Sequence, residues 1–197
     1  MDTLRDRQGH PSARRTARWA LGLTAFAAAW LMQCVSVVHA QQPNEFQVKA
    51  AYLYNFGKYV EWPARTAAAP NDSFAICVFG RDPFGSVLDS TFVNERIEGK
   101  SVLARRISRP ADAINCRILF ISASSSSNLK EILAVVDKAG ILTVSDIPQF
   151  SSHGGIIEFV LEGSKVRFEI NIATAESAGL KISSELLKVA RTVRVTP

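Results

Sequence analysis

The sequence predicts an α/β fold: a single three-layer domain with a mixed, largely parallel sheet and a C-terminal β-hairpin followed by a helix. Between residues 46 and 144, short apolar runs bounded by turn residues alternate with amphipathic helical segments, as in a parallel sheet covered by helices. After His153-Gly154-Gly155, two strands follow one another with only a short turn between them. The sheet is therefore expected to be mixed.

The first helix is expected to start at Asn44-Glu45 and to continue through residues 46–60, where apolar residues share one broad face. It ends before the Trp62-Pro63 pair because proline disfavours helical geometry in the preceding residue. A linker at 64–72 leads to strands at 74–79, 101–107, 117–121 and 141–144, with a turn at 80–85, a short helix near 86–90, and a helix at 128–138 that Gly140 ends. The hairpin strands are expected at 156–161 and 166–170. The last helix begins at Ser183 or Ser184 and runs to Val193.

Residues 1–40 have the pattern of a secretory signal peptide. Five arginines lie ahead of an apolar stretch from Trp19 to Met32, and Val38-His39-Ala40 provides a suitable cleavage site. We expect cleavage after Ala40 and a mature domain of residues 41–197. The alternative is an uncleaved anchor, which Gln33 disfavours by interrupting the apolar stretch before it reaches the roughly 20 residues of a membrane span.

Composition excludes several classes of function. Most of the formal net charge of +5 belongs to residues 1–40, and a near-neutral mature domain is a poor candidate for nucleic-acid binding. The mature domain has one histidine, His153, so a histidine-rich zinc site is excluded and a Ser-His-Asp hydrolase would depend on that residue alone. We interpret His153 as a surface or turn residue and expect no enzyme activity, no metal and no cofactor.

Two cysteines remain in the mature domain. Cys77 lies in the first expected sheet strand and Cys116 at the start of the third, so that neighbouring strands could bring them within disulfide reach. An exported domain with two cysteines favours a disulfide over two buried free thiols. Whether that bridge is only structural or also redox-sensing stays open.

Polar residues that follow the strands form a candidate ligand site. The segment 80–85 has the glycine spacing of a phosphate-binding loop but lacks its lysine, so an ordinary tight turn is favoured over an anion site. Asp82 and Asp146 both follow expected strands, where open α/β sheets bind ligands, although acids also suit turns and helix caps. The candidate ligand-binding residues are Gly80, Arg81, Asp82 and Asp146.

The first helix is unusually aromatic. Tyr52, Tyr54, Phe56, Tyr59 and Trp62 fall on more than one face, which indicates either deep burial or a second face that meets a partner. The candidate partner-binding residues are Tyr52, Tyr59, Glu61, Trp62, Leu186 and Leu187. The basic strand 104–107, with Arg109 beyond it, is interpreted as a solvated edge rather than a binding patch.

Seven blocks of sequence, taken in order, resemble the YfiR family of periplasmic proteins. They are VKAAYLYNFGKYVEWP (48–63), ICVFG (76–80), CRILFI (116–121), LTVSD (142–146), GGI (154–156), VRFEIN (166–171) and GLKISSELLK (179–188). The resemblance implies a periplasmic protein that represses an inner-membrane diguanylate cyclase by binding its periplasmic segment, thereby lowering cyclic-di-GMP and biofilm formation. A homodimer is left open.

Some members of that family have a further cysteine pair near the Gly-Gly segment. Here Ser151 and Glu158 stand in that region and neither is a cysteine, so redox switching through a second pair is not expected. A second hypothesis is a periplasmic sensor that binds a small molecule or nucleotide at 80–85 and Asp146. The two hypotheses are compatible, since a ligand that prefers one conformation can control partner binding.

Overall fold

The computed structural model describes residues 44–63 and 73–195. The predicted signal peptide and the linker at 64–72 lie outside the described residues. Within the described part, an eight-stranded sheet has the order β10-β8-β7-β6-β5-β2-β4-β3. Its strands are β2 (Ser73–Phe79), β3 (Arg96–Ile97), β4 (Lys100–Ile107), β5 (Ile118–Ile121), β6 (Leu142–Ser145), β7 (Ile157–Glu162), β8 (Lys165–Asn171) and β10 (Thr192–Arg194). A small second sheet pairs β1 (Val60–Glu61) with β9 (Lys181–Ile182).

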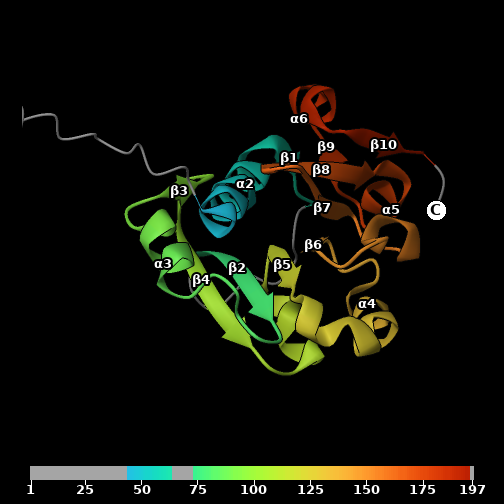
Figure 1. Cartoon of the computed structure of the whole chain (residues 1–197). Helices are drawn as coiled ribbons and strands as arrows, with labels where there is room; N and C mark the ends of the chain where they lie inside the picture. Colours follow the sequence, from blue (N-terminus) through green and yellow to red (C-terminus); the bar gives the residue numbers. More distant parts are fainter. Residues whose placement is uncertain (1–43, 64–72, 196–197) are drawn as a thin grey trace, which may run out of the picture. The chain divides into compact units, whose positions relative to one another are not determined.

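Strand direction confirms the predicted mixed sheet. The run β4-β2-β5-β6-β7 is parallel throughout, whereas β7 and β8 form the expected antiparallel hairpin. The short β3 is antiparallel to β4, and β10 runs parallel to β8. Figure 1 shows β3 and β4 at one side of this sheet and β10 at the other.

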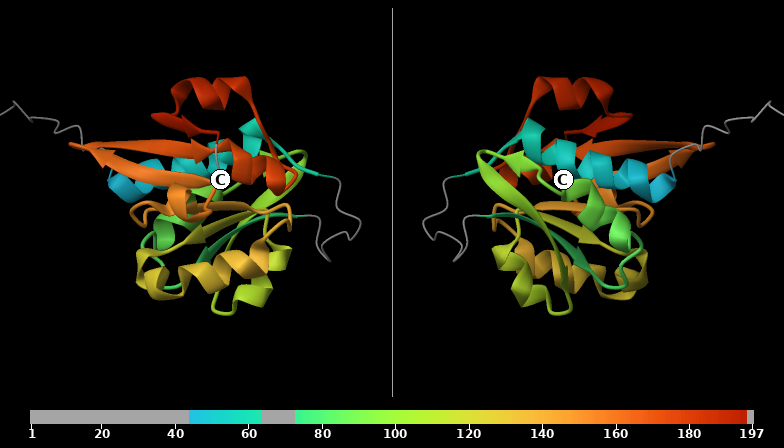
Figure 2. Two further views of the ribbon diagram at one scale, coloured as in Figure 1. Left: turned by 90° about the vertical axis from the view of Figure 1, so that its right-hand side faces the viewer. Right: turned by 90° about the vertical axis from the view of Figure 1, so that its left-hand side faces the viewer.

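Helices lie on both faces of the sheet, giving the expected three layers. They are α2 (Glu45–Tyr59), α3 (Ser86–Phe92), α4 (Leu129–Val136), α5 (Ile172–Ser177) and α6 (Ser184–Val189), with 3-10 helices η1 (Pro110–Asn115), η2 (Ala123–Asn128) and η3 (Phe150–His153). Figure 2 shows α2 and α6 on one side of the sheet and α4 on the other. Two apolar clusters result: a larger one with α2 and α3, and a smaller one with α4, η1 and η3.

α2, the longest helix of the described residues, starts where the sequence expects. The Asn44 side chain accepts a hydrogen bond from the Phe46 amide, and the Gln47 side chain accepts one from the Asn44 amide at 2.9 Å. These bonds satisfy amides that have no partner inside the helix. At the other end, the chain turns extended at Val60 and enters β1 ahead of Trp62 and Pro63.

Two expectations need correction in detail. α4 ends at Val136 rather than residue 138, and both Lys138 and Gly140 have positive φ in the loop that follows. The C-terminal helix ends at Val189, and Val193 lies in β10. The physical reason is that the Arg191 amide donates to the Phe168 carbonyl at 2.8 Å, so pairing with β8 replaces helical continuation. No helix in residues 44–63 and 73–195 has the length and apolar character needed to cross a membrane.

The Gly-Gly segment gives a test of packing. A Cβ atom at Gly155 would overlap the ring of Phe150, which is fully buried, whereas at Gly99 it would meet nothing within 4 Å but would suffer a φ of +77°. We therefore expect Gly155→Ala to lower the free energy of unfolding by about 3 kcal/mol through overpacking, and Gly99→Ala by only about 1 kcal/mol through backbone strain. Urea unfolding of both variants measures this, and equal losses would contradict it.

Candidate functional site

The disulfide expected between Cys77 and Cys116 is confirmed, with Cα atoms 5.9 Å apart. Both cysteines are buried in the smaller apolar cluster. β2 and β5 are adjacent, and the Arg117 amide donates to the Ala75 carbonyl at 2.8 Å, so the backbone itself holds Cys116 beside Cys77. The bridge fixes the start of β5 against β2.

The candidate ligand loop follows β2, at the point where the order of the parallel strands reverses. In chain order the parallel strands run outward from β2 first to β4 and then, on the other side, from β5 to β7. Ligands in open α/β folds bind at such a switch point, beyond the carboxyl ends of the strands. Here the loop after β2 meets the serine run after β5, because the Arg81 amide donates to Ser124 Oγ at 2.9 Å.

Gly80 permits this close approach. Its φ is +88°, and a Cβ atom there would lie 2.8 Å from Ser124 Oγ and closer still to Ser125 Oγ. A side chain at this position would therefore separate the two loops. Arg81 extends from the same turn and is exposed.

Arg106 at the end of β4 fastens the rest of this loop. Its Nε is 2.8 Å from Asp82 Oδ2, its Nη1 is 2.7 Å from Asp89 Oδ1, and its Nη2 donates to the Gly85 carbonyl at 2.7 Å. Asp82 Oδ1 also accepts from the Phe84 amide at 2.8 Å. The Asp89 carboxylate and burial act oppositely on Arg106, and the hydrogen bond to Asp89 dominates, so the pKa of the guanidinium is raised. Asp82 therefore acts within the turn that it helps to form.

Asp146 is held by a different cation. Lys49, on α2, has a side chain that is only 3% exposed, and its Nζ lies 2.7 Å from Asp146 Oδ2 and 2.5 Å from Glu45 Oε1. The ammonium also lies 5.1 Å from the ring centroid of Phe46. Asp146 Oδ1 is buried and has no hydrogen-bond partner in the described part of the chain. This oxygen is therefore the acceptor that remains unsatisfied among Glu45, Lys49 and Asp146.

The four candidate ligand residues thus fall into two groups. Gly80, Arg81 and Asp82 share one turn, whereas Asp146 belongs with Lys49 on the far side of β5. Sequence reasoning missed Lys49, although a signal existed: it stands four residues before Leu53, on the apolar face of the helix, and four after Glu45.

Ser151 and Glu158 are in direct contact. Glu158 Oε2 accepts from the Ser151 hydroxyl at 2.8 Å and from its amide at 3.0 Å, and Oε1 accepts from the Gln149 amide at 2.8 Å. Both residues are buried. Hydrogen bonds between Ser151 and Glu158 therefore join η3 to β7 in the region where some family members have a second cysteine pair.

The six candidate partner residues differ widely in exposure. Tyr52 is partly buried against the larger core, where its ring meets that of Phe168 edge to face at a centroid distance of 5.3 Å, and Leu186 is buried. Trp62 and Leu187 are half-buried against the same core. Tyr59 is 43% exposed, and Glu61 is exposed and forms a 3.7 Å ion pair with Lys181.

His153 lies exposed in η3. Its Nδ1 is 2.7 Å from the Gln149 carbonyl oxygen. Among residues 44–63 and 73–195, no three His, Cys, Asp or Glu residues cluster as metal ligands.

The sequence model of the YfiR/HmsC-like family matches residues 46–191, from the first helix to the approach of β10. The chain belongs to this family. The YfiR/HmsC-like family is periplasmic, and its members are regulatory rather than catalytic. No curated protein matches the chain.

Among solved structures, a conserved domain protein from Vibrio cholerae O1 biovar El Tor is similar, with a TM-score of 0.54 and 11% identity over 76% of this chain. The match spans 60% of that structure's chain. An ABC domain from Streptococcus pneumoniae, solved with L-Trp, matches at a TM-score of 0.45 and 12% identity over 61% of this chain and 55% of its own. The first likeness shows the fold alone.

Loss of the disulfide has a calculable cost. Removing it as Cys77→Ala with Cys116→Ala releases a loop with a sequence separation of 39. The chain-entropy relation gives about 4 kcal/mol for a loop of this length, so the melting temperature should fall by about 10 °C. Differential scanning calorimetry with and without a reductant measures this. Reductant should lower the wild-type value and leave the double variant unchanged; an unchanged melting temperature in the variant would contradict a stabilising bridge.

The Arg106 contacts predict a pH effect. The hydrogen bond from Arg106 holds the pKa of Asp89 below its ordinary value of 3.8. The stabilisation is therefore present above pH 3.8 and is lost as the pH falls through the lower folded-state pKa. Because Asp89 is largely exposed, Asp89→Asn should cost only about 1 kcal/mol or less at neutral pH, and nothing in strong acid. Urea unfolding across pH checks this. Equal costs of Asp89→Asn at neutral pH and in strong acid would contradict this prediction.

Proposed function

We propose that the protein is a periplasmic repressor that binds the periplasmic segment of an inner-membrane diguanylate cyclase, lowering cyclic-di-GMP and biofilm formation. The observation that carries this proposal is the family match over residues 46–191. Residues 1–40 would serve as the export signal, and mass spectrometry of the secreted form would detect cleavage after Ala40.

The proposed partner surface lies where α2 ends. Tyr59 and Glu61 are exposed there, Trp62 and Leu187 are half-buried against the larger core, and the Ser183 amide donates to the Tyr59 carbonyl at 2.9 Å. An exposed aromatic side chain on a rigid, packed base is typical of interface hot spots. Tyr52 and Leu186 would support this surface from within the core. A second copy of the chain could use the same surface, in which case addition of the partner would convert a homodimer to a heteromeric complex in analytical ultracentrifugation.

A second candidate function is supported by the unpaired Asp146 Oδ1 atom. A small molecule with a hydrogen-bond donor could bind this oxygen, and an anion could bind the turn of Gly80 and Arg81, so that a ligand controls the conformation that meets the partner. Thermal-shift screening of a metabolite panel tests this. Saturable stabilisation that Asp146→Asn abolishes would support it, and a flat response across the panel would contradict it.

Partner binding gives the decisive prediction. The full chain should capture the periplasmic segment of a diguanylate cyclase encoded near its gene, and deletion of its gene should raise cyclic-di-GMP. Tyr59→Glu should weaken binding about tenfold or more, because an aromatic anchor is replaced by a charge. Surface plasmon resonance and a cyclic-di-GMP assay in wild-type and deletion cells measure these effects.

A matched control is Val135→Glu, which also places an acid at an exposed apolar position, but on α4 across the sheet. It should bind like the wild type. Absence of capture together with unchanged cyclic-di-GMP would contradict the proposed function. Equal weakening by both variants would contradict only the surface.

A further inference from the structure

The outer edge of β4 has no neighbouring strand over most of its length. β3 pairs with β4 only at Lys100 and Ser101, and the Glu95 carbonyl then accepts from the Val102 amide at 3.0 Å. In residues 44–63 and 73–195, no strand continues this pairing along 103–107. The inner edge is fully paired with β2 over the same stretch.

The direction of the free main-chain groups follows from that last bond. Along a strand, successive residues direct their N–H and C=O groups alternately to the two edges. Because the Val102 amide points outward to Glu95, the groups of Ala104 and Arg106 point outward too, and those of Leu103 and Arg105 bond to β2. Ala104 and Arg106 thus offer two donors and two acceptors at the spacing that an added strand requires.

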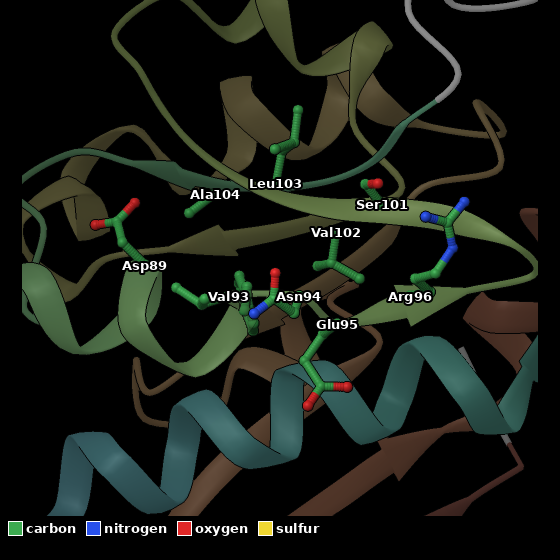
Figure 3. Close-up of a pocket in the computed structure, with 10 residues that line it drawn as sticks. Asp89, Val93, Asn94, Glu95, Arg96, Ser101, Val102, Leu103 and Ala104 are labelled. Carbon is green, nitrogen blue, oxygen red and sulfur yellow. The ribbon is translucent and has the colours of Figure 1, made fainter.

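A groove of about 430 Å³ runs beside this edge. Figure 3 shows it between β4 and the segment that joins α3 to β3, with Val93, Glu95 and Ala104 around it. Phe92 and Val102 are its buried base, and Val93 at its rim is 63% exposed. An apolar side chain of an incoming strand would find room here, on the face of the sheet that α3 covers.

Charge distinguishes the two faces of the edge. Arg106 is fully engaged with Asp82, Asp89 and Gly85 on the groove face. Arg105 points to the opposite face and forms no ion pair in the described part of the chain. A side chain directly opposite Arg105 on an added strand would therefore gain most by being acidic, and its two neighbours would lie on the groove face, with the one opposite Ala104 at the groove itself.

We propose that the outer edge of β4 binds an extended segment of a partner protein as an added β-strand, recognised by an apolar-acidic-apolar sequence whose acid faces Arg105. Main-chain bonds to Ala104 and Arg106 supply affinity, and the groove and Arg105 supply specificity. A second copy of β4 is a poor occupant, because two basic strands would repel each other. The inference rests on the proposed function, because it assumes a protein that binds partners and adds a second binding surface to the one at the end of α2.

The probe is an acetylated, amidated peptide, Lys-Thr-Val-Glu-Val-Thr-Lys, titrated into the full chain by NMR or fluorescence anisotropy. Saturable binding is expected, with the amides of Ala104 and Arg106 protected from hydrogen exchange. A peptide methylated on its backbone nitrogens should not bind, since it keeps the side chains but lacks the donors. A peptide with lysine in place of glutamate should bind about fivefold more weakly.

Arg105→Glu should invert this preference: binding of the glutamate peptide weakens about fivefold or more, and the lysine peptide becomes the better ligand. Lys165→Glu, the same change of charge on the exposed turn end of β8, should leave both affinities unchanged. Circular dichroism of each variant confirms folding, and the methylated peptide tests the idea without any variant.

Three outcomes would overturn the proposal: no saturable binding, protection from hydrogen exchange at amides away from β4, or affinities that change neither with Arg105→Glu nor with backbone methylation. These failures are separable from failure of the proposed function. If the wild type captures the cyclase segment but does not bind the peptide, and Arg105→Glu captures that segment equally well, the repressor function is supported and the edge of β4 is not a binding surface.

Discussion

Pairing of β2 along both of its edges is the constraint on which the rest of the structure depends. Its residues alternate between the two apolar clusters, with Ile76 and Val78 in the larger and Ala75 and Cys77 in the smaller. A slip of one residue in its register would exchange these faces, so the packing of both layers fixes the register. That register places Cys77 toward Cys116 and delivers the Gly80 turn to the serines after β5. The disulfide and the candidate ligand loop are therefore consequences of one strand's position.

Buried charges position the elements around this sheet. Glu158 and Glu169 are directly opposite in the β7-β8 hairpin, and both are buried. Like charges directly opposite each other on paired strands are destabilising, so each carboxylate needs its own donors to offset the repulsion. Glu158 takes amides of η3, whereas Glu169 pairs with Arg191 at 2.9 Å and Arg194 at 3.4 Å. The donors that offset this repulsion thus attach both the C-terminal β10 and η3 to the hairpin.

The sequence predicts the parallel strands, the hairpin, α2 and the disulfide, because each of these follows from local periodicity, turn residues or cysteine count. It fails where distant contacts override local pattern. Val193 fits the spacing of the last helix, yet pairing with β8 draws it into β10. Lys49 reads as a charged interruption of an apolar face, and only the tertiary fold brings Asp146, 97 residues away, to its ammonium. Tyr52 and Tyr59 look alike in sequence, and packing alone separates a core ring from an exposed one.

Each end of the eight-stranded sheet exposes an edge, and an exposed edge pairs with other chains unless it is short or charged. β10 is short and ends in Arg194, and the Glu169 pairing draws that arginine inward. The outer edge of β4 is longer and carries two arginines of opposite roles. Arg106 turns its charge inward to hold the loop after β2, which preserves the groove, while Arg105 keeps its charge available on the other face. The cation that disfavours pairing with an identical strand is also the group that favours an acidic one, so one residue can disfavour pairing of two copies at this edge and select a partner strand.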